Sequence, residues 1–452
     1  MTKRILSFSF LIIIFLVLIS CVFGYFIEAK LDKSQEAGEI SVAWDAKEAY
    51  PLYENEPEAT RDDYTLNKGS VFFNKITGVF NSLRSGIKAR VTNSYPFRMP
   101  FIKLQKIWDK SILGYNLTTS LNGTEMEAEY GENVVALQNG QLSYFLPDRD
   151  LSFNTERFIS FGKEMQSEGR DFLLFITPSK SNSSEIAPEY FGVYKDYTSE
   201  KEGQLIELLT TSSIDYVICD GIQRKINEGD DVFFNTDHHW LPQTALLGCK
   251  ELTEYMNAHY GYSIDTSIYS LDNYNISDSP YLFLGSQGKK VTEIYVEPEN
   301  ISIITPNYDS DYTVFISGIN RTLTGSIFDT LINMKAIKND LYTNNQYNAY
   351  GYGDQEYIHI HNNKLNDGKR VLIIKQSFAD TMIPFLGNIA EDIDIIDYRL
   401  FSGSVRRFID QNNPDDIVFI YGATAFCQND SVVYAPIRYE KLRKYCSIIS
   451  GK

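Results

Sequence analysis

The sequence predicts an α/β fold in which helices flank a parallel sheet, with a mainly β insertion and an N-terminal membrane anchor helix. Strand-like apolar runs alternate with helix-like segments between residues 371 and 421. Short runs of β-branched and aromatic residues dominate 262–366, and an uncharged apolar run occupies 5–27. The alternation indicates right-handed β-α-β crossovers, and such crossovers build parallel sheets.

The apolar run at 5–27 is expected to cross a membrane once. Its length is sufficient to span a hydrocarbon core of ~30 Å at ~1.5 Å per helical residue. Lys3 and Arg4 precede the run and acidic residues follow it. The positive-inside rule therefore makes residues 1–4 a cytoplasmic tip and places the bulk of the chain outside the cell membrane.

Two alternatives to an uncleaved span stay open. A cleaved signal peptide is the first, although the run is longer than a usual signal-peptide core. The second is a lipoprotein anchor, because Leu18-Ile19-Ser20-Cys21 resembles a lipidation site and lipid on Cys21 would replace the span. Residues 28–100 are polar, acidic or mixed, and we interpret them as a stalk that leads into the main domain.

Composition restricts the partners. The 452 residues carry a net charge of −17, which argues against nucleic acid, since binding to nucleic acid requires basic patches. The chain contains 31 Tyr and 28 Phe, and such aromatic side chains suit stacking on sugars, though Tyr also simply fills sheets. No cofactor motif is present.

The first predicted core strand is Phe172–Ile176, which ends at Thr177-Pro178-Ser179-Lys180. Lys180 therefore follows the carboxyl end of a strand, where open α/β sheets bind ligands. We expect a solvated loop lysine there, with a ligand contact as the alternative. Further elements expected in this part of the chain are a helix from Asn154 to Gly169, a helix near 202–210 and a strand at 216–219.

The segment Asn235–Trp240, Asn-Thr-Asp-His-His-Trp, contains two of the five histidines in the chain. A His beside an Asp can activate a hydroxyl nucleophile, because the carboxylate orients the imidazole and stabilises its protonated form. Asp237 and His239 are two residues apart, so in an extended segment they share a face. That spacing favours His239 over His238 as the base. No third or fourth ligand stands at a supporting spacing, so no metal site is predicted.

The matching hydroxyl is predicted to be Ser377, within Lys-Gln-Ser-Phe-Ala-Asp at 375–380. It follows the strand-like run 371–374 and precedes a helix expected over 379–389, a setting that exposes a serine at the edge of a sheet. The alternative is a helix N-cap. Two later strands, 393–396 and 417–421, bring Arg399 and the Gly422–Thr424 turn to the same edge.

The β-rich insertion, 262–366, separates the two motifs and is expected to pack beside the core and shape the cleft. Strands are predicted at 294–296, 301–304 and 313–316. His359 and His361 alternate with Ile358 and Ile360, so they share one strand face. We expect that face to be solvated, and a metal site is the alternative.

Asp237-His238-His239-Trp240 resembles the signature of the DHHW protein family, and Lys375–Asp380 with Pro384-Phe385-Leu386 resembles its serine segment. That family is similar to the AlgJ/AlgX-type alginate O-acetyltransferases, whose domain is SGNH-hydrolase-like. The Asp-x-His-Trp precedes the serine in that group, as it does here. The resemblance covers 101–440 and implies an SGNH-like catalytic domain.

The resemblance implies an extracellular O-acetyltransferase that modifies a cell-surface or secreted polysaccharide. His239, oriented by Asp237, would deprotonate Ser377, which would carry the acetyl group to a sugar. An MBOAT-type membrane acyltransferase would supply that group. The alternatives are a polysaccharide acetyl esterase and a non-catalytic export or assembly protein.

The chain departs from the SGNH pattern at two places. In the usual SGNH serine motif Gly-Asp precedes the serine, whereas this chain has Lys375-Gln376 at that place. The Asn that donates a hydrogen bond to the oxyanion in SGNH enzymes is not found in this sequence. Thr424 or Gln376 could substitute for that Asn. Arg399 is either a substrate contact or an ion-pair partner, and Trp240 is either a packing anchor or, less expected, a platform for sugar.

Overall fold

The computed structural model describes residues 134–187 and 195–427 and isolated positions between 103 and 117. The chain divides into two units, 1–85 and 86–452, and all described residues belong to the second. The predicted anchor at 5–27, Cys21 and the stalk lie outside the described residues. Within the described part, no helix combines the length and apolar character needed to span a membrane.

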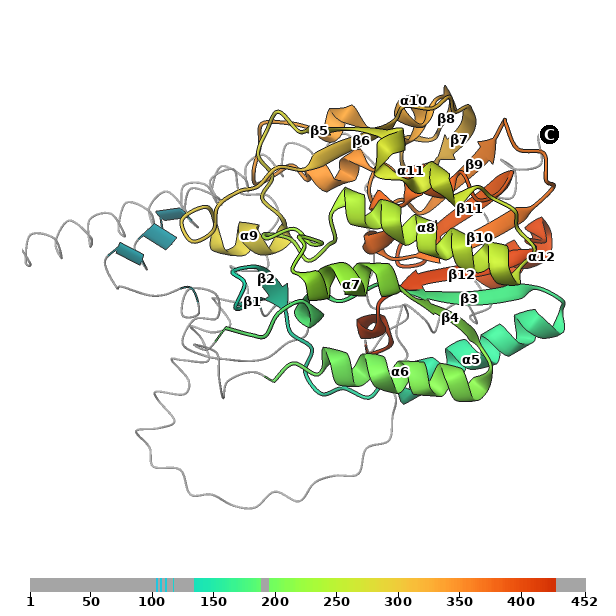
Figure 1. Ribbon diagram of the computed structural model, residues 1–452, viewed down its shortest axis with the longest axis horizontal. Helices are drawn as coiled ribbons and strands as arrows, with labels where there is room; N and C mark the ends of the chain where they lie inside the picture. Colours follow the sequence, from blue (N-terminus) through green and yellow to red (C-terminus); the bar gives the residue numbers. More distant parts are fainter. Residues whose placement is uncertain are drawn as a thin grey trace, which may run out of the picture. The chain divides into compact units, whose positions relative to one another are not determined.

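The core of the described part is an eight-stranded sheet with the order β4-β3-β12-β10-β11-β9-β7-β8 (Figure 1). The first five strands in that order run parallel, and the last three are antiparallel to their neighbours. The strands are β3 (Asp171–Ile176), β4 (Asp215–Ile218), β7 (Tyr312–Ile316), β8 (Arg321–Gly325), β9 (Tyr357–Asn362), β10 (Arg370–Lys375), β11 (Asp392–Asp397) and β12 (Asp416–Tyr421).

Helices cover both faces of the parallel strands, which explains why those strands are apolar on both sides. One face packs against buried side chains of α7 and α8, and the other against those of α5, α6 and α12. The bounds are α5 (Ser152–Ser167), α6 (Thr198–Ser212), α7 (Asp220–Glu228), α8 (Pro242–His259), α11 (Ile383–Leu386) and α12 (Val405–Asn412).

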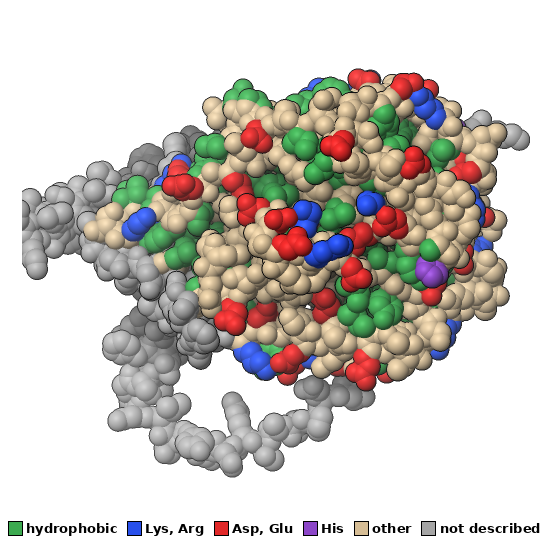
Figure 2. All heavy atoms as spheres, in the orientation of Figure 1, with side chains coloured by type: hydrophobic (Ala, Val, Ile, Leu, Met, Phe, Trp, Pro, Cys, Tyr) green, Lys and Arg blue, Asp and Glu red, His purple; other side chains and the backbone are tan. Residues whose placement is uncertain are grey.

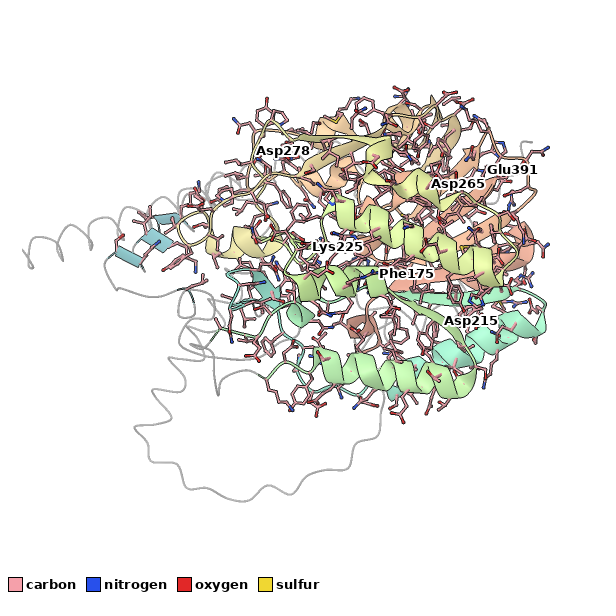
Figure 3. All side chains as sticks on the ribbon, in the orientation of Figure 1. Phe175, Asp215, Lys225, Asp265, Asp278 and Glu391 are labelled. Atoms are coloured by element: carbon pink, nitrogen blue, oxygen red, sulfur yellow. The ribbon has the colours of Figure 1, made fainter. Side chains whose placement is uncertain are left out.

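One close approach positions α8 on the sheet. A Cβ on Gly248 would lie 3.3 Å from Trp240 and 3.5 Å from Phe175, the core residue of β3 that Figure 3 labels. Glycine therefore lets the helix backbone rest on these two rings. The helix follows the Asp-His-His-Trp segment directly, so its packing also places that segment against the sheet.

The prediction of a parallel sheet with a separate insertion is partly wrong, because the sheet is mixed. Strands β7, β8 and β9 come from the 262–366 insertion and extend the same sheet. Only seven residues, 363–369, connect β9 to β10. So short a connection cannot make the crossover that a parallel pair requires, and β9 pairs antiparallel with β11 instead.

The rest of the insertion forms a small two-stranded sheet of β5 (Tyr274–Asp278) and β6 (Ser302–Pro306) with the short helices α9 (Ser286–Val291) and α10 (Ile327–Leu331). The strand predicted at 294–296 is wrong, since these residues form turns. A hairpin of β1 (Val134–Ala136) and β2 (Leu142–Tyr144) precedes α5. On the face shown in Figure 2, acidic and basic side chains are interspersed and acidic ones are in the majority.

Candidate active site

Ser377, His239 and Asp237 form one chain of hydrogen bonds. The Nε2 atom of His239 lies 2.8 Å from Oγ of Ser377, and its Nδ1 atom lies 2.6 Å from Oδ1 of Asp237. Ser377 opens a short 3-10 helix, Ser377–Thr381, after β10. The backbone N–H of Gln376 donates to Ile420 in β12 at 3.3 Å, so the serine is held at the carboxyl end of the parallel strands.

Asp237 is buried and its carboxylate is fully engaged. Its Oδ1 accepts the backbone N–H of His239 at 3.1 Å, and its Oδ2 accepts that of Ser286 at 2.6 Å. Burial opposes its charge, but His239 and His238 outweigh burial and hold the pKa of Asp237 well below its usual range. A Cβ on Gly285 would overlap Asp237, so glycine is required beside it. The carboxylate is therefore charged and can stabilise an imidazolium.

Aromatic rings fix the orientation of the His239 imidazole. Tyr347 stacks on it with ring centroids 4.3 Å apart and planes at 16°, and Phe378 meets its edge at 5.0 Å. The Tyr347 hydroxyl donates to the backbone carbonyl of Ser377 at 3.1 Å. Tyr347 lies in the insertion, far in sequence from both motifs, and no local pattern singles it out.

His238 lies beside His239 and lines the cavity. Its ring centroid is 3.8 Å from that of His239, and its Nδ1 atom lies 3.2 Å from Oγ of Ser286. Burial and the neighbouring His239 lower the pKa of His238, even though 31% of its side chain is exposed. It is therefore neutral near pH 7 and offers a polar edge to a ligand.

Trp240 is a packing anchor, and its alternative role as a platform for sugar is wrong. The side chain is fully buried, so no ligand reaches its face. Its Nε1–H donates to the carbonyl of Phe378 and to Oγ1 of Thr381, both at 2.9 Å. The indole thus ties the Asp-His-His-Trp segment to the helix that carries Ser377.

The expectation of a solvated Lys180 is also wrong, because the side chain is only 2% exposed. Its ammonium donates to the backbone carbonyls of Phe234, Asn235 and Asp237. Burial lowers the pKa of Lys180 to about 7, against the attraction of Asp237 and Glu299. Lys180 therefore holds the loop that carries His239. The position of Lys180 after a strand does not predict this role.

The residue before Gln376 anchors a buried ion cluster. Lys375 contacts Asp380, and its Nζ atom lies 3.1 Å from carboxylate oxygens of Asp354 and of Asp397. Arg399 binds both oxygens of Asp397, with its Nε 2.9 Å from Oδ1 and its Nη2 2.6 Å from Oδ2. Lysine therefore stands before the serine as the counter-ion of three carboxylates, and Arg399 is an ion-pair partner at the cavity edge.

Ser377 lines a cavity of about 230 Å³, and the other residues that were predicted at strand ends line the same cavity. Lys180, Gln376, Arg399 and Thr424 all line it, as the sheet topology predicted. The cavity is also lined by residues that the sequence did not indicate as part of the site, namely Tyr144, Phe145 and Glu202. No described residue accepts a hydrogen bond from the backbone N–H of Ser377 or Phe378.

Ligand atoms of Asp237, His238 and His239 all lie within 4.8 Å of one another, a spacing that could hold a metal ion. Both ring nitrogens of His239 are already used, however, one by Asp237 and the other by Ser377. The local geometry is that of a hydroxyl, an imidazole and a carboxylate in series.

The fold and the site define an α/β protein with a Ser-His-Asp hydrogen-bonded series at the carboxyl ends of parallel strands. The model of the DHHW protein family matches residues 216–396, which confirms the resemblance seen in the sequence. By sequence, the chain matches no curated protein.

Solved structures resemble the chain at low identity. Bacillus cereus PatB1 with a sulfonyl adduct is 16% identical, with a TM-score of 0.52 over 67% of this chain and 99% of that one. A DHHW family protein from Eubacterium siraeum is 17% identical, with a TM-score of 0.49 over 67% and 96%. The O-acetyltransferase domain of Pseudomonas putida AlgJ is 12% identical, with a TM-score of 0.39 over 68% and 93%. The likeness to PatB1 shows a shared fold.

Proposed function

We propose that this protein is an extracytoplasmic O-acetyltransferase of a cell-surface or secreted polysaccharide, with Ser377 as the acetyl carrier. The observation that carries the proposal is the hydrogen bond of 2.8 Å between Nε2 of His239 and Oγ of Ser377, which lines a cavity. A serine in that position can be deprotonated as it attacks. We infer from the family resemblance that the transferred group is acetyl and that the acceptor is a sugar.

The first half-reaction loads the serine. Nε2 of His239 takes the proton from Ser377 as Oγ attacks the carbonyl carbon of an acetyl donor. Asp237 stabilises the resulting imidazolium. The bond from acetyl to its leaving group then breaks, and the leaving group takes the proton from His239. The product is acetyl-Ser377.

The second half-reaction uses the same groups in reverse. A sugar hydroxyl gives its proton to His239 and attacks the acetyl carbon, and the ester bond to Ser377 breaks. Oγ of Ser377 regains its proton from His239. In both steps the backbone N–H groups of Ser377 and Phe378 are the proposed donors to the negative oxygen, since neither has another acceptor among the described residues.

We further propose that the chain is held at the outer face of the membrane by residues 5–27 and receives acetyl from an MBOAT-type membrane acyltransferase. This part rests on the apolar run and on the resemblance alone. The SGNH-like character of the domain is part of the same proposal, supported by the serine at a strand end. An esterase would form the same acyl-serine and pass it to water.

The test uses the purified full-length chain, a chromogenic acetyl ester and an oligosaccharide acceptor. Mass spectrometry is expected to find acetyl on Ser377 and, with the acceptor present, on the sugar. Ser377→Ala should abolish both, whereas Ser167→Ala, on an exposed turn of α5, should retain both. Because a sulfonyl adduct was obtained with PatB1, a sulfonyl fluoride is a second probe for Ser377.

Each outcome assigns a function. Acetate release that the sugar does not alter would replace the transferase with an esterase. Equal behaviour of the wild-type chain and Ser377→Ala, with no covalent species on either, would refute the catalytic role and leave a binding function.

A further inference from the structure

His238 is the polar residue of the Asp-His-His-Trp segment that the proposed chemistry leaves unused. It lines the same cavity as Ser377, and its ring centroid lies 3.8 Å from that of His239. The side chain of His238 is 31% exposed, whereas that of His239 is 9% exposed. A ligand in the cavity that reaches the His239 ring therefore also meets the ring of His238.

The histidines of β9 are placed differently. Nδ1 of His359 lies 2.9 Å from Oδ1 of Asp394, and Nδ1 of His361 lies 2.9 Å from Oδ1 of Asp392. Their strand face is part-exposed rather than fully solvated, because both rings pair with these aspartates of β11. Neither ring lines the cavity that holds Ser377. Cross-strand pairing accounts for both, whereas His238 faces a space that a ligand can fill.

His238 is neutral at the pH at which the other histidine works. Burial and the neighbouring His239 lower the pKa of His238 to about 3, against the attraction of Asp237. Neutrality also suits the proposed transfer, because His239 becomes positively charged in each half-reaction. A second positive ring beside it would oppose that charge.

The proton of neutral His238 belongs on Nδ1. That atom lies 3.2 Å from Oγ of Ser286 and 3.3 Å from Oδ1 of Asp237. An ionised carboxylate only accepts hydrogen bonds, so a lone pair on Nδ1 would face it unfavourably. Ser286 is fixed in turn, since its backbone N–H donates to Oδ2 of Asp237 at 2.6 Å. The lone pair of His238 is therefore on Nε2.

That lone pair has no donor within the protein. No described residue donates a hydrogen bond to Nε2 of His238, whereas Nδ1 is held by Ser286 and Asp237. The ring is part-exposed on the cavity wall. Ligand sites fix orientation with a few polar groups of this kind among apolar and aromatic walls. An unused hydrogen-bond acceptor therefore stands directly beside the base proposed to activate the sugar hydroxyl.

We propose that His238 orients the acceptor, with Nε2 accepting a hydrogen bond from a donor on the carbon next to the hydroxyl that attacks acetyl-Ser377. This inference rests on the function proposed above. The rings of His238 and His239 lie alongside each other, so the two groups that they engage come from adjacent carbons. The donor is a second hydroxyl, as in the 1,2-diol of a sugar ring, or the N–H of an acetamido group. An ether or a carboxylate at that carbon would meet the lone pair with another acceptor.

The test follows the transfer step in the full-length chain with three small alcohols as acceptors. Ethylene glycol carries a neighbouring hydroxyl, N-acetylethanolamine a neighbouring N–H, and 2-methoxyethanol an ether oxygen that cannot donate. The chain is loaded with the chromogenic acetyl ester, and the acetylated alcohol is quantified per acetyl-Ser377, so that a change in loading does not enter. We expect at least one of the two donors to react about 2–12-fold faster than 2-methoxyethanol, the range that one typical hydrogen bond supplies. The faster of the two identifies the donor.

Variants of His238 separate recognition from structure. His238→Phe keeps a ring beside His239 without its nitrogens and should use the three alcohols at similar rates. His238→Gln brings an amide oxygen near the place of Nε2 and should keep part of the preference. A purely structural role would slow all three alcohols alike and leave the preference intact. His259→Phe makes the same exchange at an exposed histidine that ends α8, and it should match the wild-type chain.

The outcomes separate this inference from the function on which it rests. Absence of acetyl-Ser377 from the wild-type chain would refute the proposed function, and the role of His238 with it. If acetyl-Ser377 forms, three results would overturn the role of His238 alone. These are equal use of the three alcohols by the wild-type chain, transfer to none of them, and a preference that His238→Phe retains.

Discussion

Oγ of Ser377 lies 2.8 Å from Nε2 of His239, although the two residues are 138 positions apart in the sequence. The contact forms because β10 delivers the serine, and the loop before α8 delivers the histidine, to the same end of the sheet. Hydrogen bonds of Lys180 and of Trp240 then hold that loop in place. The proposed catalysis and the positioning of the loop therefore depend on different residues and can be measured separately.

Asp237→Asn should lower the rate of acyl-serine formation by on the order of 10³–10⁴-fold. An amide keeps the shape of the side chain but cannot stabilise an imidazolium, and it favours the wrong histidine tautomer. Burst-phase kinetics with the chromogenic ester measures the step. Asp231→Asn, at an exposed position upstream on the same loop, should react like the wild-type chain. Retained rates in Asp237→Asn would mean that the carboxylate has no role in the chemistry.

Lys180→Met should reveal a pH-dependent contribution to stability. Burial lowers the pKa of Lys180 to about 7 from an ordinary value of 10.5. Between these values the unfolded chain binds more protons than the folded one, so the free energy of unfolding rises with pH. The methionine variant lacks this rise. Urea unfolding at pH 7 and pH 10 should show that the wild-type chain gains stability relative to the variant, and a constant difference would contradict a buried, titrating lysine.

Lys375→Met should be strongly destabilising, by about 3–5 kcal/mol, because it removes the cation paired with the buried Asp380, whereas Arg399 still pairs with Asp354 and Asp397. Burial, together with the Asp354 and Asp397 carboxylates, raises the pKa of Asp380 against the opposing attraction of Lys375. Removing the lysine should raise it further. Thermal and denaturant unfolding measure the loss.

The matched control for that variant is Lys364→Met. Lys364 pairs with an exposed Asp309 at the surface, and pairs of this kind contribute roughly 0–1 kcal/mol. Similar losses in the two lysine variants would show that the cluster around Lys375 is no stronger than a surface ion pair.

Trp240→Phe should lower stability without altering recognition of the acceptor. It removes the N–H that serves Phe378 and Thr381, which keep longer contacts to the Tyr347 hydroxyl, and the loss of a typical hydrogen bond costs about 0.5–1.5 kcal/mol. The melting temperature should fall, and the KM for the sugar should stay within about twofold of the wild-type value. A large rise in KM with unchanged stability would restore the idea of a sugar platform.

Most of the candidate site could be predicted from the sequence. Ser377, His239 and Asp237 each follow a recognisable local pattern, and Lys180, Arg399 and Thr424 were expected at strand ends. These predictions work because parallel strands bring their carboxyl ends to one edge. Tyr347 could not be predicted, since it reaches the site from an irregular part of the insertion.

The sequence by itself determined the apolar and polar periodicity, and with it the parallel strands and the residues at their ends. Only the tertiary structure decided how buried each charge is and what compensates it. From the sequence, Lys180 was expected to be a solvated loop lysine, but in the folded chain its ammonium contacts three backbone carbonyls. From the sequence, Lys375 was only a departure from a motif, but in the folded chain it contacts three carboxylates. Hydrophobic periodicity is local along the chain, whereas the desolvation of a charge depends on segments that are far apart in sequence and meet only in the folded protein.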